Sequence, residues 1–252
     1  MALITLMRRW LWRLRSFFYF SPTALILAGV CIFAYIALSI SSRIEFAFGY
    51  SFADAIRAFF GLNWGLLKAG FFWQPATYVF LHAGFFHLLF NMIALLLFGS
   101  GVEAEVGSRR FLAIFFIGGI IGGLGWLALL ALLPYLPSMP DTSQWVPHFV
   151  RSWMPHSSGR ATLAGAMCIG ASGAVFSLIG AYAAMFPSRQ VIWFMPFPLR
   201  ISARWLAIVL GVLTVLEAVV IHSQVAYAAH MAGGFAGYLY GLWLNKRGYY
   251  GD

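Results

Sequence analysis

The feature that most constrains this chain is a series of six apolar stretches, each about as long as a membrane is thick. A helix needs about 20 apolar residues to cross a hydrocarbon core of about 30 Å. Charged residues make up only 9% of the sequence, whereas soluble domains carry about 25%, so lipid must solvate most of the surface. We therefore expect an all-α membrane protein with spans at about 22–41, 76–98, 111–133, 165–186, 202–222 and 225–245.

The net charge of +9 is explained by membrane topology better than by a nucleic-acid partner, and we expect no nucleic acid. With the N-terminus inside, the inner segments hold eleven of the sixteen Lys and Arg residues, as the positive-inside rule requires. Both termini are therefore predicted to be cytoplasmic. We divide the chain into a basic interfacial segment (1–21), a six-span domain (22–245) and a short tail (246–252). The Arg-rich, acid-free start would also fit an organelle transit peptide.

Two long outer connections separate the predicted spans. Residues 42–74 mix aromatic residues, glycines and a few charges, which is too polar to span and too apolar for a free linker. We expect short helices or a re-entrant hairpin there, partly embedded in the outer interface. The second connection, residues 134–164, is rich in proline and is also placed outside. Cys31 and Cys168 have no spacing typical of a metal or redox site and are interpreted as packing residues.

Polar groups inside a span are costly, so each one is a functional candidate. The second predicted span contains His82, His87 and Asn91, the fourth opens with Ser172, and the sixth contains His230. The spans contain no Asp and the chain contains no HExxH motif, which excludes the aspartate and zinc classes of intramembrane protease. We expect neither a metal nor a cofactor.

Three of these side chains lie at similar predicted depths. At about 1.5 Å per residue, His87, Ser172 and His230 lie roughly 18, 21 and 22 Å above the inner face. A serine hydroxyl needs a base to become a nucleophile, and histidine is the usual base. Glu217 lies on another helix near the outer boundary, so the residues favour a Ser172–His230 dyad over a triad.

Glycines around the serine fit this chemistry. Gly170 and Gly173 permit a sharp entry into the fourth span, so that the helix begins near Ser172 with free backbone N–H groups. Such donors, at the positive end of a helix dipole, suit a developing oxyanion. His87 and Asn91 share one helix face at i, i+4 and could add further donors.

Small residues also mark the predicted contact between the fourth and sixth spans. Gly233 and Gly237 lie on the same face as His230, and small residues let two membrane helices approach closely. Close approach would bring His230 to Ser172. Outside the site, Glu103 is expected to cap or tether the inner loop near Gly107.

Taken in chain order, three motifs carry a family resemblance: His82-x4-His87-x3-Asn91, Gly170-Ala171-Ser172-Gly173, and Ala229-His230-x2-Gly233-x3-Gly237. Together they resemble those of the rhomboid family of intramembrane serine proteases. The likeness extends from about residue 72 to residue 244 and includes the six-span count and the long first loop.

The resemblance implies a rhomboid-like bundle that cleaves single-span or multi-span membrane proteins in or near the bilayer. By that likeness Ser172 would be the nucleophile and His230 the base. His87, Asn91 and the Ser172 amide would line an oxyanion hole beside Gly170, with His82 in support. The expected location is a bacterial inner membrane, with the lipid bilayer as the other partner.

Two positions depart from the family pattern. Trp73-Gln74-Pro75 stands where many members have Trp-Arg, and Phe176 stands where a Tyr often packs beneath the histidine, so we expect ring stacking without a hydroxyl contact. Two alternative functions remain: a catalytically inactive rhomboid-like protein that binds membrane helices, and a transporter or channel. Retention of the serine and histidine argues against the first, and the sparse polar cluster against the second.

Overall fold

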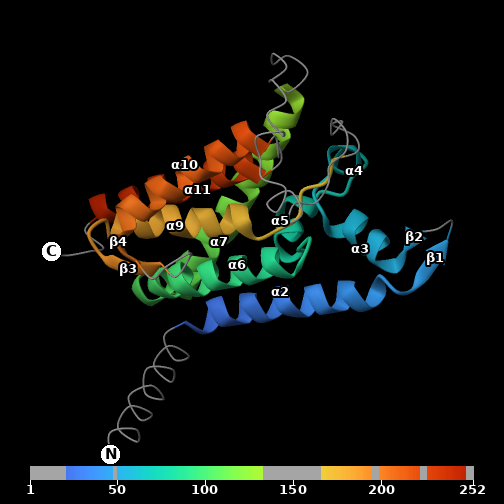
Figure 1. Ribbon diagram of the computed structural model, residues 1–252, viewed down its shortest axis with the longest axis horizontal. Coiled ribbons are helices and arrows are strands. Elements are labelled where there is room, and N and C mark those ends of the chain that lie inside the picture. The colour runs from blue at the N-terminus through green and yellow to red at the C-terminus, as the bar shows by residue number, and fades with distance from the viewer. Residues whose placement is uncertain (1–20, 48–49, 133–165, 194–198, 222–225, 248–252) are drawn as a thin grey trace, which may run out of the picture.

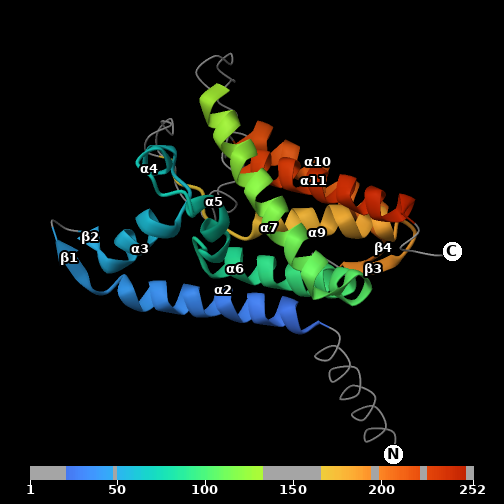
Figure 2. The same cartoon turned by 180° about the vertical axis from the view of Figure 1, so that it is seen from behind.

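The computed structural model describes residues 21–47, 50–132, 166–193, 199–221 and 226–247. These residues form a helical bundle, with a long helix, α2, lying along one side (Figures 1 and 2). Two short antiparallel hairpins, which the all-α prediction did not include, lie at opposite ends of the bundle. Three predicted features lie outside the described residues: the interfacial segment over residues 1–20, the whole connection 134–164, and the C-terminal tail from residue 248.

The first long connection forms short elements, as the sequence predicted. Helices this short are marginal by themselves, so they depend on contacts with one another and with the bundle. In chain order after α2 (Pro22–Ser41) they are β1 (Glu45–Ala47), β2 (Tyr50–Ser51), α3 (Phe52–Phe60), α4 (Trp64–Lys68), α5 (Gln74–Thr77) and the 3₁₀ turn η1 (Tyr78–Phe80).

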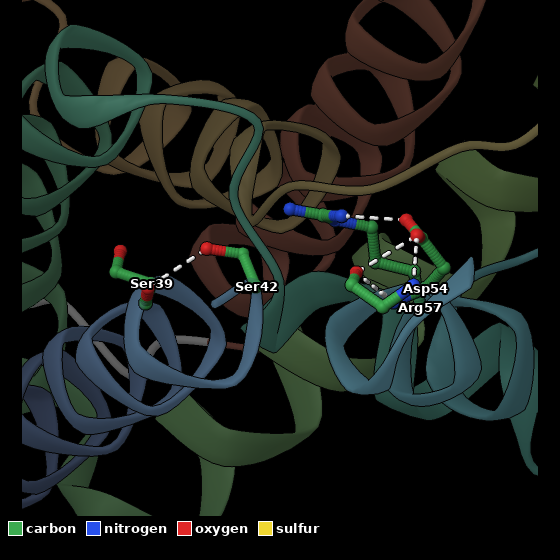
Figure 3. Close-up of polar contacts among 5 residues, drawn as sticks. Ser39, Ser42, Asp54 and Arg57 are labelled. Atoms are coloured by element: carbon green, nitrogen blue, oxygen red, sulfur yellow. Dashed lines mark hydrogen bonds and ion pairs between the residues drawn. The ribbon is translucent and has the colours of Figure 1, made fainter. Parts of the chain in front are cut away.

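Side-chain hydrogen bonds mark the end of α2 and the start of α3. At the end of α2 the Ser42 hydroxyl donates to the Ser39 carbonyl at 2.8 Å (Figure 3). At the start of α3 the Ser51 hydroxyl accepts from the Asp54 amide while the Asp54 carboxylate accepts from the Ser51 amide, which is a capping box. The hydrogen bonds from Ser51, and then the nearby Arg57 guanidinium, hold the pKa of Asp54 below its usual value.

Gln74 occupies a structural position at the centre of this loop. Its side chain is fully buried, where its amide donates to the Ala58 carbonyl at 2.8 Å and its oxygen accepts from the Asn63 amide at 3.1 Å. The neighbouring Trp73 indole donates to the Phe59 carbonyl at 2.8 Å. A neutral amide therefore joins α3, α4 and α5 at the position where many family members were expected to have arginine.

The prediction of one continuous helix over 76–98 was wrong. The structure has α5 and η1, then an extended segment, and only then α6 (Phe85–Ala94). A hydropathy profile shows only an unbroken apolar run here. Pro75 lies in the first turn of the short helix α5, and Gly84 adopts extended backbone as the N-cap of α6. As a consequence His82 lies in the connection before α6 rather than on the helix.

The next helices run with few interruptions. The π-helical turn η2 (Leu95–Gly99) continues α6 into α7 (Ser100–Leu132), which changes direction at Gly107, where φ is +77°. Glu103 is buried just before this kink and accepts from the Ser108 hydroxyl at 2.7 Å, as the predicted tether requires. Its carboxylate also accepts the backbone amides of Thr23 and Ala24 at 3.0 and 2.9 Å, and so caps α2.

The core of the bundle is α9 (Ser172–Met185), which is buried on nearly every side. It packs against α7 and against α11 (Ala226–Lys246), and both views show it in the interior between α6 and α11. A helix buried all round must be apolar all round, and α9 carries only small and apolar residues apart from two serines and a tyrosine. Residues 166–171 are not helical, so the predicted span over 165–186 is helical only from Ser172.

A second hairpin, β3 (Gln190–Trp193) and β4 (Leu199–Ser202), links α9 to α10 (Ala203–Ile221). Within the described residues, two helical stretches are long and apolar enough to cross a membrane, Pro22–Ser41 and Phe85–Leu132. Ser172–Met185 and Ala203–Leu216 are shorter apolar helices. The helical character predicted from the sequence is present, and the crossing by six spans stays a prediction.

Candidate active site

The predicted site residues meet in one cavity of about 470 Å³ between α6, α9, α10 and α11. Ser172, His230, His87 and Asn91 all line it. Its remaining lining is apolar apart from one threonine: Phe90, Ala94, Phe98, Val175, Phe176, Ile179, Leu210, Leu213 and Thr214. The cavity therefore combines a few convergent polar groups with an apolar wall, which is the usual character of a ligand site.

Ser172 is the first residue of α9, so its backbone N–H belongs to the first turn and has no partner within the helix. The segment before it is held by extended pairing rather than by helix. The backbones of Leu62 and Cys168 exchange two hydrogen bonds, at 3.0 and 2.9 Å, and the Gly170 amide donates to the Tyr78 carbonyl at 3.0 Å. The first long loop thereby fixes the direction from which the chain enters α9.

Gly170 is required here for two separate reasons. Its φ of +134° lies in the region that L side chains rarely adopt. A Cβ at this position would also lie 2.6 Å from Cε1 and 2.8 Å from Nε2 of His87, and 3.7 Å from the Ser172 hydroxyl oxygen. The His87 ring therefore lies directly against the Gly170 backbone, beside the serine.

The contact of His87 with the Ala83 amide indicates which ring nitrogen of His87 carries the proton. Its Nδ1 accepts a long hydrogen bond, 3.4 Å, from the Ala83 amide. In a neutral imidazole the other nitrogen then carries the proton, so Nε2 is a donor aimed at the corner formed by Gly170 and Ser172. This is the region where an oxyanion next to the serine would form.

His230 is oriented by an aromatic ring rather than by a carboxylate. Its imidazole stacks on Phe176 with ring centroids 4.3 Å apart and an angle of only 2° between the planes. Both ring nitrogens are buried and have no hydrogen-bond partner among the described residues, so the structure contains no Ser172–His230 hydrogen bond. Ser172 and His230 nevertheless line the same cavity.

Two further polar residues support the corner. Asn91 donates from Nδ2 to the His87 carbonyl at 2.7 Å, and its amide group has a second N–H to offer. His82 does not line the cavity; its Nδ1 lies 3.3 Å from the Phe80 carbonyl, and its ring meets His87 edge to face at 5.2 Å. His82 therefore reaches the cavity residues through its ring contact with His87.

The glycines of α11 bring the two halves of the site together. A Cβ at Gly233 would collide with the Gly173 carbonyl, and a Cβ at Gly237 with the Ser177 carbonyl. Gly180 of α9 is equally close to the α11 backbone. The two helices therefore touch backbone to backbone, which brings His230 to the cavity that Ser172 lines.

Sequence reasoning missed two contributors to this site. The pairing of the first loop with residues before α9 has no local signal, because strand pairing depends on partners far apart in the chain. Thr214 on α10 carries a recognisable signal, a buried polar group within an apolar helix. No group of three or more metal-binding side chains occurs in the part of the chain that the structure describes.

Comparison with known proteins identifies the family of the chain. The sequence profile of the Rhomboid domain matches residues 69–247. Rhomboid protein 1, mitochondrial, from Saccharomyces cerevisiae is 28% identical over 168 residues, which cover 66% of this chain and 40% of that protein. The putative rhomboid protease YdcA of Bacillus subtilis is 42% identical over 64 residues, 25% of this chain and 32% of the relative.

A third relative bears on activity. The inactive RHOMBOID-like protein 8 of Arabidopsis thaliana is 37% identical over 65 residues, 25% of this chain and 18% of that protein. The chain spans less than half the length of each of these curated relatives. Because the Rhomboid domain accounts for more than half of the sequence, the chain belongs to the rhomboid family of integral membrane proteins.

Proposed function

We propose that this protein is an intramembrane serine endopeptidase that uses Ser172 as nucleophile and His230 as general base. The observation that carries the proposal is the shared cavity. Ser172, at a helix N-terminus, and His230, whose ring nitrogens have no hydrogen-bond partner among the described residues, both line it. The imidazole of His87 and the side-chain amide of Asn91 line it as well. The relatives named as proteases support this activity, and the relative named as inactive makes the identity of these residues decisive.

In this mechanism the Ser172 oxygen attacks the carbonyl carbon of a peptide bond while His230 takes the hydroxyl proton. The oxyanion that forms accepts hydrogen bonds from the Ser172 amide, from His87 Nε2 and from the free N–H of Asn91. His230 then returns the proton to the leaving amine, and water hydrolyses the acyl-enzyme. Stacking on Phe176 keeps the imidazole in position, so the acidic residue of a catalytic triad is not needed.

The substrate would be a membrane protein whose chain can unwind into the cavity. The apolar wall between α6, α9 and α10 suits a small or apolar side chain next to the scissile bond. We further propose a multi-pass arrangement with cytoplasmic termini, in which the long first loop lies partly in the outer interface. A bacterial inner membrane is the proposed location.

The test is cleavage of a single-span substrate by purified protein in liposomes. We expect the parent protein to produce two fragments, and the Ser172→Ala and His230→Ala variants to produce none. Phe176→Tyr serves as the matched control, because it preserves the stacking ring and should retain cleavage. Equal cleavage by the parent and the serine variant would refute the mechanism. Absence of cleavage by the parent protein as well as by every variant would favour a protein that binds membrane helices without cutting them.

A further inference from the structure

The hairpin β3–β4 presents one face to the bundle and the other outward. Val191 and Ile201 are partners in the register and pack on the hydrophobic core. Ile192 and Arg200 are the next pair, and side chains of successive pairs point to opposite faces of a hairpin. Arg200 and Ile192 therefore face away from the core, and both are exposed.

Backbone contacts hold two more arginines beside this hairpin. The Ala203 amide donates to the Arg189 carbonyl at 2.9 Å, and the Arg204 amide to the Pro187 carbonyl at 3.2 Å. The chain entering the hairpin is thus joined to the chain leaving it, which fixes Arg189 and Arg204 at its base. The Arg189 guanidinium lies over the Phe186 ring at 4.3 Å, which restricts its position further.

The end of α11 adds charge at the same end of the molecule. Figure 1 shows β3 and β4 beside the C-terminal end of α11, far along the bundle from the start of α9. Lys246 ends α11, and Arg247, which follows it, lies over the Trp243 ring at 4.4 Å. We call the exposed face formed by Arg189, Arg200, Arg204, Lys246 and Arg247 the basic end.

The segments that carry these five residues contain no acidic side chain: residues 186–216 and 226–247 have neither Asp nor Glu. Arg189, Arg200 and Arg204 are exposed, and within the described residues none of them forms an ion pair. Large apolar side chains lie among them: Leu199 is 58% exposed and Trp205 is 56% exposed. A cationic surface that also exposes aromatic and aliphatic groups suits a ligand with both an anionic and an apolar part.

We propose that the basic end binds the headgroup of an anionic phospholipid. Guanidinium groups bind phosphate through paired hydrogen bonds, and Trp residues favour the level of the headgroups. An acidic protein segment would satisfy the arginines, but it would offer no apolar group to Leu199 and Trp205. A phospholipid satisfies both, because its acyl chains lie beside the apolar side chains. The family of this chain is integral to the membrane, so such lipids are always adjacent.

The test is binding of dioctanoyl phosphatidylglycerol to the delipidated full chain in a non-ionic detergent, followed by Trp fluorescence and native mass spectrometry. We expect the Arg200→Gln/Arg204→Gln variant to bind roughly thirtyfold more weakly, at about fivefold for each basic residue near a surface. The Arg200→Lys/Arg204→Lys variant keeps the charge and should retain most of the affinity. Circular dichroism verifies that each variant keeps its helix content.

The control removes two charges at the other end of the molecule. Arg43→Gln/Lys68→Gln should bind the lipid as the parent does, because both residues belong to the first loop region. Three results would overturn the proposal: equal binding of phosphatidylcholine, equal binding by the Arg200→Gln/Arg204→Gln variant, or equal occupancy by inorganic phosphate or polyglutamate. None of these measurements depends on proteolytic activity, so they are independent of the proposed function.

Discussion

Replacement of Gly170 by alanine tests the geometry of the site most finely. The methyl group would enter a backbone with φ of +134° and meet the His87 ring at 2.6–2.8 Å. The strained backbone costs about 1–3 kcal/mol, and the forced movement of a packed ring costs about 1–3 kcal/mol more. Because loss of one oxyanion donor lowers kcat by about 10²–10³, we expect Gly170→Ala to lose activity by that factor.

The chain offers a matched control for the backbone strain alone. Gly70 also has a positive φ, +104°, and a Cβ there would meet nothing within 4 Å. Gly70→Ala should therefore lose about 1–3 kcal/mol of stability and keep normal turnover for each folded molecule. Stability is followed by unfolding in mixed detergent micelles, and turnover by the liposome cleavage assay.

A double-mutant cycle isolates the contact with His87. If the methyl group acts by displacing this ring, Gly170→Ala should cost much less in a His87→Ala background than in the parent. Additive effects of the two substitutions would show that the ring contact is irrelevant. Activity of Gly170→Ala within twofold of the parent would refute the oxyanion corner altogether.

Three further predictions concern the packing and the caps. Gly237→Ala should lower both stability and turnover, by about 1–3 kcal/mol in unfolding free energy, because the α9 backbone fills that space. Gly211→Ala, where a Cβ meets nothing within 4 Å, should keep turnover and should not lower stability, because alanine favours the helix. Glu103→Gln removes a buried carboxylate that accepts three hydrogen bonds, so hydrogen exchange at the start of α2 should rise, whereas exposed Glu105→Gln should change nothing. The pKa of Asp54 is lowered in the folded protein, so the α3 cap should contribute stability above the unfolded pKa and lose it as the pH falls through the lowered one. Protection factors at α3, in which the intrinsic pH dependence of exchange is divided out, would instead stay constant with pH if the cap were unimportant.

The sequence predicts much of the site because its chemistry depends on local patterns. Gly170 and Ser172 were predicted to open a helix, and the structure begins α9 at Ser172. Helical spacing put Asn91 on the face of His87, and the two residues share a hydrogen bond. Stacking of Phe176 on His230 has a different source: the family resemblance allowed it, and the structure shows it.

The sequence could not predict features that depend on distant partners or on backbone breaks within apolar runs. The predicted span over 76–98 is an unbroken apolar run by hydropathy, yet the helix stops after Phe80 and starts again after Gly84, which leaves His82 in a connection. The two hairpins pair only four residues a strand or fewer, which is too short for a period-two pattern to stand out. Gln74 was noted only as a departure, and its buried hydrogen bonds became visible only with the fold.

The central claim is that Ser172 is a nucleophile activated by His230. The most direct measurement is labelling of the purified protein in liposomes with a fluorophosphonate probe, followed by mapping of the modified residue by mass spectrometry. The account predicts modification at Ser172 alone, and its loss in the His230→Ala variant. Labelling that is absent from the folded parent protein, or that persists at Ser172 when His230 is removed, would contradict the account.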